Sequence, residues 1–290
     1  KQGSLKMKID SKKIIEKIQK NAYLRCNIIL GVILFYMYAF PLIYSHQANF
    51  LYLTISTMRK TLLLLLTILS TTTFSVSGIS PRACVSILGD SYSTFEGHVT
   101  PDTNYVWYFK TPKPELTDVS DVSQTWWQQL IRDKNLRLEV NNSFSGATIC
   151  NRGYRGEDYS DRSFLTRVKA LGSPDIILVF GGTNDSWAGV EVGEYLDSEG
   201  KTADGSAPDL YTFRPALDIM LAEMKDYYPG TDIYFIVNTK LRPEITESIE
   251  TLCRKHNIET IMLKDIAKKA NHPSVKGMEE IARQVGERIK

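Results

Sequence analysis

Short apolar runs alternate with helix-like segments through most of the chain after residue 80. Brief apolar or β-branched runs predict five buried strands, at 83–88, 136–140, 175–180, 233–237 and 258–262. Apolar positions recurring every three or four residues, together with capping residues, predict helices at 124–134, 163–171, 210–228, 244–256 and 274–289. Strands that alternate with helices indicate an α/β fold, in which helices cover both faces of a parallel sheet.

Two apolar segments precede this region. Residues 28–44 are long enough for a marginal membrane span, and a lysine-rich stretch lies in front of them. The pattern restarts at 58–78, where Met-Arg-Lys, a run of leucines and a group of small residues follow in the order of a secretory signal peptide. We therefore expect residues 79–290 to form a single domain that is exported, to the periplasm or beyond, after cleavage. Residues 1–57 are either untranslated upstream sequence, the interpretation we favour, or an anchor with its lysines in the cytoplasm.

Removal of residues 1–78 reverses the sign of the net charge. The chain has 35 Lys and Arg against 33 Asp and Glu, and this segment holds 10 of the former and 2 of the latter, which leaves 25 against 31. Because phosphate neutralisation needs a clustered basic face, we expect no nucleic-acid partner. The remaining cysteines are odd in number and do not form a disulfide framework; they are Cys84, Cys150 and Cys253. Cys84 directly precedes a strand and is read as a strand residue.

Polar residues follow three of the predicted strands, and a histidine precedes the last helix. The first strand ends in Gly89-Asp90-Ser91, and the third in Gly181-Gly182-Thr183-Asn184-Asp185. Gly146 follows the second strand, within Asn142-Ser143-Phe144-Ser145-Gly146-Ala147, and the histidine lies in Asn271-His272-Pro273. Loops at the carboxyl ends of parallel strands converge on one crevice, so Ser91, Gly146 and Asn184 should lie at one edge of the sheet.

In order and context these four stretches resemble the sequence blocks of the SGNH (GDSL-type) hydrolase family of esterases and lipases, over about residues 85–285. The resemblance implies a three-layer doubly wound sheet of about five parallel strands in flavodoxin-like order. It implies that Ser91 is the nucleophile and His272 the general base. The implied oxyanion hole consists of the backbone N–H groups of Ser91 and Gly146 and the side-chain amide of Asn184.

The sequence departs from the family pattern beside the histidine. An aspartate usually stands three residues upstream, where it fixes the tautomer and stabilises the imidazolium, and here that position is Lys269. Either a backbone carbonyl orients His272, or a carboxylate arrives from elsewhere, with Asp265 the nearest upstream. The departure favours a Ser-His pair.

Each site residue also has a purely structural interpretation. Ser91 fits a turn, Asn184 a cap, and His272 a cap for the last helix, but together in one crevice they favour a site. His98, in a long polar excursion over 96–119, is a backup base, and Asp90 is expected to be structural.

Aromatic and charged loop residues are the candidates for substrate contact. Trp107 and Trp187 fall in loops near the expected crevice, where their faces could stack on sugar rings or simply pack against the core. Arg155 follows Gly146 in a polar loop with Arg152, Glu157 and Asp158; these residues could orient a hydroxyl-rich substrate or form solvated ion pairs.

These features predict an exported serine esterase that removes acetyl or another short acyl group from a small molecule or glycan, with no cofactor and no metal. The chain lacks the glycine-rich nucleotide fingerprints and zinc-ligand spacings. The alternatives are a non-catalytic carbohydrate-binding module on the same fold, suggested by Lys269, and a lipase or lysophospholipase of the same family. The mature domain is expected to have no membrane partner unless residues 28–44 are an anchor. The sequence leaves the oligomeric state open.

Overall fold

The computed structural model describes residues 82–289, so the predicted signal peptide and the segment 1–57 lie outside the described residues. Five parallel strands form one sheet in the order β2-β1-β3-β4-β5. Their bounds are β1 Cys84–Gly89, β2 Arg137–Ser143, β3 Ile176–Phe180, β4 Asp232–Val237 and β5 Glu259–Met262. The predicted α/β class, the number of strands and the flavodoxin-like order are thereby confirmed.

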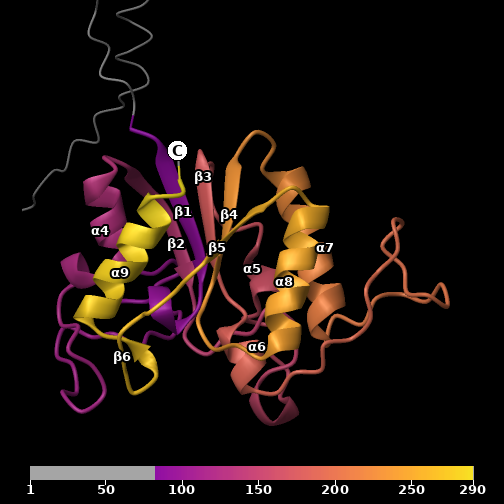
Figure 1. Ribbon diagram of the computed structural model, residues 1–290, viewed down its shortest axis with the longest axis horizontal. Helices are drawn as coiled ribbons and strands as arrows, with labels where there is room; N and C mark the ends of the chain where they lie inside the picture. Colours follow the sequence, from indigo (N-terminus) through magenta and orange to yellow (C-terminus); the bar gives the residue numbers. More distant parts are fainter. Residues whose placement is uncertain (1–81, 290) are drawn as a thin grey trace, which may run out of the picture. The chain divides into compact units, whose positions relative to one another are not determined.

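Helices cover both faces of this sheet (Figure 1). Helices α4 (Trp126–Asp133) and α9 (Val275–Gly286) pack on one face, and α5 (Phe164–Arg167), α7 (Phe213–Tyr227) and α8 (Pro243–Lys255) pack on the other. Strand β3 is buried on both sides: Ile177 and Val179 enter one core, and Leu178 and Phe180 enter the other. This two-sided burial explains why β3 reads as a continuous apolar run.

Four of the five predicted helices are shorter than the sequence pattern predicts, α8 has the predicted length, and β2 is longer. The predicted helix 163–171 contains one helical turn, α5, which the Ser163 hydroxyl caps by accepting from the N–H of Thr166. Strand β2 continues through Asn141, Asn142 and Ser143, residues that are uncommon in strands. Their burial is compensated by hydrogen bonds; for example, the Asn141 side chain donates to the carbonyl of Ser93 over 2.9 Å.

The hydrophobic pattern of the sequence does not predict several short elements. They are α6 (Thr183–Trp187), the hairpin of β6 (Lys268–Lys269) and β7 (His272–Pro273), and three 3₁₀ turns, η1 (Ser91–Ser93), η2 (Val122–Gln124) and η3 (Tyr154–Gly156). Elements of two to five residues are too brief to show a periodicity. Three of them, η1, α6 and the β6–β7 hairpin, carry the candidate site.

Within residues 82–289, no helix is long and apolar enough to cross a bilayer. The apolar segment 28–44, for which an anchor is one interpretation, lies outside that range.

Candidate active site

Ser91 lies in the turn directly after β1. The carboxylate of Asp90 accepts a hydrogen bond from the N–H of Tyr92 over 3.0 Å and thereby caps η1. Glycine is required at position 89, because a Cβ there would lie 2.5 Å from the Ser143 hydroxyl and 2.7 Å from the Cβ of Ser93. This close packing holds Ser91 at the carboxyl edge of the sheet, where it is buried.

His272 reaches Ser91 from the β6–β7 hairpin. Ala270 and Asn271 form the turn of this hairpin with φ of 43° and 63°, in the left-handed region. The Nε2 atom of His272 lies 3.0 Å from Oγ of Ser91. The structure thus brings together the serine and the histidine, 181 residues apart in the chain.

A backbone carbonyl orients the imidazole. Nδ1 of His272 lies 3.0 Å from the carbonyl oxygen of Ala270, so Nδ1 carries the proton and Nε2 is free to accept one from Ser91. Asp265 makes no hydrogen bond to His272 in the described part of the chain. Lys269, at the position of the missing aspartate, instead donates to the carbonyl of Pro114. The sequence left two candidates for the group that orients His272, a backbone carbonyl and a carboxylate. In the structure it is the carbonyl of Ala270.

Aromatic rings enclose the imidazole. The indole of Trp107 is stacked on it, and Tyr92 and Trp187 approach at centroid distances of 5.3 and 5.9 Å. Burial therefore lowers the pKa of His272 to about 4; the Ala270 hydrogen bond opposes this shift, and the positive charge of Lys268 adds to it. At neutral pH the imidazole is uncharged, which is the state that a general base requires.

The two other predicted oxyanion-hole residues lie in segments that a hydrogen bond joins through Ala147. Gly146 has a φ of +87°, so its backbone is in the region that favours glycine. Asn184, on α6, donates from its amide to the carbonyl of Ala147 over 2.9 Å, and its amide oxygen accepts from the Tyr154 hydroxyl over 2.8 Å. An asparagine amide has two N–H bonds, so one remains for a substrate oxygen once the other is used.

Asp185 is a positioning residue that sequence reasoning missed. It is fully buried, and its carboxylate accepts from the backbone N–H of Ile149 over 2.9 Å and of Cys150 over 3.4 Å. Burial raises its pKa to about 6, and these hydrogen bonds counteract the rise. Asp185 therefore ties α6 to the loop that contains Gly146. The available signal was a carboxylate directly after a strand-end asparagine.

A buried arginine at the ends of β1 and β2 was also missed. Arg167 donates to the carbonyl of Gly89 over 3.2 Å and to that of Asn142. Burial lowers the pKa of Arg167 to about 9 and raises that of Asp90 to about 7. Desolvation acts against both charges, so we assign Arg167 and Asp90 to the support of the β1 and β2 strand ends. The expectation that Asp90 is structural agrees with its position.

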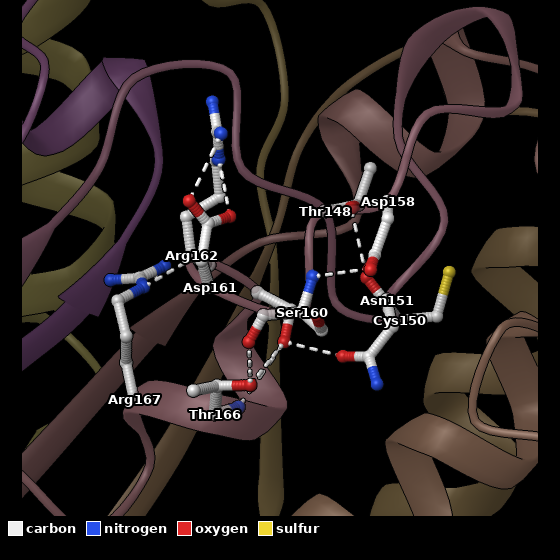
Figure 2. Close-up of polar contacts among 10 residues, drawn as sticks. Thr148, Cys150, Asn151, Asp158, Ser160, Asp161, Arg162, Thr166 and Arg167 are labelled. Atoms are coloured by element: carbon white, nitrogen blue, oxygen red, sulfur yellow. Dashed lines mark hydrogen bonds and ion pairs between the residues drawn. The ribbon is translucent and has the colours of Figure 1, made fainter.

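The polar loop after Gly146 is held by its own side chains (Figure 2). The Ser163 hydroxyl donates to the side-chain oxygen of Asn151 over 2.8 Å, and Asp158 accepts from the N–H of Ser160 over 2.9 Å. Arg155, in this loop, is exposed and has no hydrogen bond to Ser91 or His272. Of the three predicted substrate contacts, Trp107 and Trp187 contact the imidazole, whereas Arg155 follows Tyr154, whose hydroxyl bonds Asn184, and its contact with substrate stays a prediction. The backup base His98 is exposed and faces Phe95 and Trp127 instead.

Comparison with known proteins identifies the family. The sequence profile described as GDSL-like lipase/acylhydrolase matches residues 83–289. The chain belongs to this family. A Bacteroides ovatus protein described as a GDSL-like lipase is 54% identical, with 71% of this chain and 97% of that one covered and a TM-score of 0.67. A Bacteroides uniformis protein of the same description is 51% identical, with 72% and 95% covered and a TM-score of 0.67. No curated protein matches the chain.

Membership confirms the predicted SGNH-type fold and the class of reaction. GDSL-like lipase/acylhydrolases are carboxylic ester hydrolases, and so is this protein. No group of three or more potential metal ligands occurs among residues 82–289.

Proposed function

We propose that this GDSL-like hydrolase is an exported serine esterase that removes acetyl or another short acyl group from a carbohydrate, through an acyl-serine intermediate. The proposal depends most on one observation. Nε2 of His272 lies 3.0 Å from Oγ of Ser91, while Nδ1 is held by the carbonyl of Ala270. This arrangement has the tautomer and the direction needed to activate a serine hydroxyl without a carboxylate.

The reaction begins with attack of Ser91 Oγ on the ester carbonyl carbon, as His272 Nε2 takes the hydroxyl proton. The negative oxygen of the tetrahedral intermediate accepts hydrogen bonds from the backbone of Ser91 and Gly146 and from the Asn184 amide. Collapse of the intermediate breaks the bond to the alcohol oxygen, which receives the proton from Nε2. The acyl group is left on Ser91.

Water completes the cycle by the same route. His272 Nε2 takes a proton from a water molecule, whose oxygen attacks the acyl carbon, and a second tetrahedral intermediate forms in the same hole. When it collapses, Ser91 Oγ leaves and recovers its proton from Nε2, and the carboxylic acid is released. The imidazolium forms twice, and the Ala270 carbonyl accepts from its Nδ1–H each time.

Exposed aromatic side chains support a carbohydrate substrate. Tyr105, Phe109 and Trp187 are 65%, 44% and 42% exposed, although large aromatic residues are usually buried. Tyr105 and Phe109 belong to the excursion that contains Trp107, and Trp187 approaches His272 itself. Flat apolar faces beside a catalytic pair suit the C–H faces of sugar rings.

Activity can be tested with the full chain and Ser91→Ala. The wild type should hydrolyse a chromogenic acetyl ester and should be labelled by a fluorophosphonate probe. Ser91→Ala should do neither. Hydrolysis that persists in Ser91→Ala would contradict the assignment of the nucleophile. A series of acyl chain lengths on one alcohol tests the short-acyl preference, and rates that rise with chain length would favour a lipase or lysophospholipase.

The second candidate is a non-catalytic carbohydrate-binding module, and the lysine at position 269 is the observation that favours it. Binding of a glycan without turnover or probe labelling would support the module. Export has its own test, because N-terminal sequencing of the protein recovered outside the cytoplasm should begin close to residue 79. A protein that retains residues 58–78 would contradict the signal peptide.

A further inference from the structure

Trp107 contacts the imidazole of His272 and also lines a separate pocket. Its indole is stacked on His272, and it also lines a pocket of about 380 Å³ within the excursion 96–119. The pocket is formed mainly by Val106, Trp107, Phe109, Pro112, Lys113 and Leu116. Its size is at the lower end of the range for small-molecule sites and suits one ring.

The pocket is fixed to the segment that contains His272. The Tyr108 hydroxyl donates to the carbonyl of Pro273 over 2.9 Å, and Asp118 accepts from the N–H of Val275 over 2.9 Å. A third link is the hydrogen bond from Lys269 to the carbonyl of Pro114. Figure 1 shows the excursion running beside the β6–β7 hairpin. These links hold the pocket at a constant place relative to the imidazole.

The chemistry of the reaction determines which half of the ester lies toward this pocket. In the proposed mechanism Nε2 of His272 returns its proton to the alcohol oxygen, so that oxygen must lie within hydrogen-bond reach of the imidazole. The carbonyl oxygen instead points to the donors of Gly146 and Asn184. Trp107 both stacks on the imidazole and lines the pocket, so we infer that the alcohol, rather than the acyl group, lies on the side of the pocket.

Among the residues of 82–289 that line the pocket, Lys113 alone is charged. Among the described residues it has no ion-pair partner, and no carboxylate lines the pocket. An unpaired ammonium beside apolar and aromatic walls is complementary to a ring that carries an anionic group.

We propose that the pocket is the leaving-alcohol subsite, and that Lys113 selects alcohols consisting of a ring with a carboxylate. This inference rests on the proposed esterase function and narrows its substrate to esters of acidic alcohols. The ring packs against Trp107 and Phe109, and the carboxylate pairs with the Lys113 ammonium. Two sources share this chemistry, a hexuronic acid and a phenolic acid, and the test contains both.

Binding of the product alcohol tests the subsite without any need for turnover. The full chain with Ser91→Ala is titrated by calorimetry with para-hydroxybenzoate and with its methyl ester, and likewise with methyl glucuronide and methyl glucoside. We expect the anionic member of at least one pair to bind more tightly. Lys113→Gln should abolish that preference, with a loss of about threefold for the anion and no change for the neutral member, as is usual for an exposed ion pair.

Lys110→Gln is the matched control, because Lys110 is an exposed lysine of the same excursion that does not line the pocket. It should leave both affinities unchanged, whereas Phe109→Ala should weaken both members of the pair. Equal effects of Lys113→Gln and Lys110→Gln, a preference for the neutral member, or no binding up to the solubility limit would each overturn the proposal. A preference for para-hydroxybenzoate alone would retain the subsite and argue against a sugar substrate.

Hydrolysis by the wild type separates this inference from the proposed function. If the chromogenic acetyl ester is turned over and the anionic alcohols show no Lys113-dependent binding, the esterase stands and the subsite fails. If the alcohols bind through Lys113 and no ester is turned over, the pocket binds acidic alcohols but is not a leaving-alcohol subsite, and the esterase fails.

Discussion

The indole of Trp107 lies parallel to the imidazole of His272, with ring centroids 3.6 Å apart and an angle of 7° between the planes. The Ala270 carbonyl fixes one edge of the imidazole, and the indole fixes its plane. An aromatic face also attracts a cation, so in the proposed mechanism the indole would stabilise the imidazolium of each half-reaction. The stack would then contribute part of what a carboxylate at position 269 supplies.

Replacement of Trp107 should slow the chemistry more than it weakens binding. We expect Trp107→Leu to lower kcat by about 3- to 30-fold on a small ester such as ethyl acetate, the range of a cation–π interaction. Trp107→Phe should lower kcat less, because it keeps an aromatic ring and because the indole N–H that it removes has no hydrogen-bond partner in the described part of the chain. Steady-state kinetics of the two variants check this, and equal rates for Leu and wild type would contradict it.

The acidic limb of the pH–activity profile should lie at an unusually low pH. His272 must be neutral to accept a proton, and burial lowers its pKa from 6.5 to about 4. Activity should therefore persist as the pH falls below 6 and be lost as it passes through about 4. Lys268→Gln removes a charge that lowers this pKa, so it should move the limb upward, whereas Lys268→Arg should leave it in place. A limb near 6.5 in the wild type would refute the assignment of His272 in this environment.

Loss of the Asn184 amide should reduce turnover by about 10²- to 10³-fold, as for other oxyanion-hole donors. Asn184→Ala is the direct test, with kcat and KM measured separately. Tyr154→Phe is a graded comparison, because it removes only the hydroxyl that bonds the Asn184 amide oxygen. A smaller loss of kcat is expected there, with KM unchanged. If Asn184→Ala retains full kcat, the hole is formed by other groups.

Asp185→Asn should disturb the proposed oxyanion hole indirectly, through the loop that contains Gly146. Both carboxylate oxygens accept from the N–H of Ile149, and Oδ1 also accepts from the N–H of Cys150. An asparagine puts an NH2 donor where one of these oxygens now accepts, so a backbone N–H would face a donor, at a cost of about 1–3 kcal/mol in stability. The free energy of unfolding in urea measures that cost. Because the loop holds Gly146, kcat should fall as well, and Asp185→Glu should not restore it. Unchanged stability and activity would show that the carboxylate is dispensable.

The sequence predicts the sheet well because its signals are local. The apolar run 176–180 and the glycines that follow it predict both β3 and the position of Asn184 at its end. The orienting group of His272 could not be predicted in this way. It depends on the left-handed turn at Ala270 and Asn271, which directs a carbonyl back to the ring, and no residue preference marks that geometry.

The contacts of Trp107 could not be predicted from a sequence pattern either. Its partner is 165 residues away, and the loop that carries it is held by hydrogen bonds from Tyr108, Asp118 and Lys269. These are tertiary contacts between irregular segments, for which neither periodicity nor capping residues give a signal. Asp185 was missed for a different reason: it reads as a helix-start residue, and only burial shows that it holds the neighbouring loop.

Lys269→Asp puts the carboxylate back at the position where the family usually has it, and we expect no gain in activity. Nδ1 of His272 already donates to Ala270, and residue 269 is exposed in β6. The substitution also removes the hydrogen bond to Pro114 that ties the excursion to the hairpin. We therefore expect kcat/KM to stay the same or fall, with Lys269→Gln as the control for loss of the ammonium. A tenfold or larger rise over Lys269→Gln, about 1.4 kcal/mol of transition-state stabilisation, would mean that the carbonyl is an inadequate substitute and that the native Ser-His pair works below its capacity.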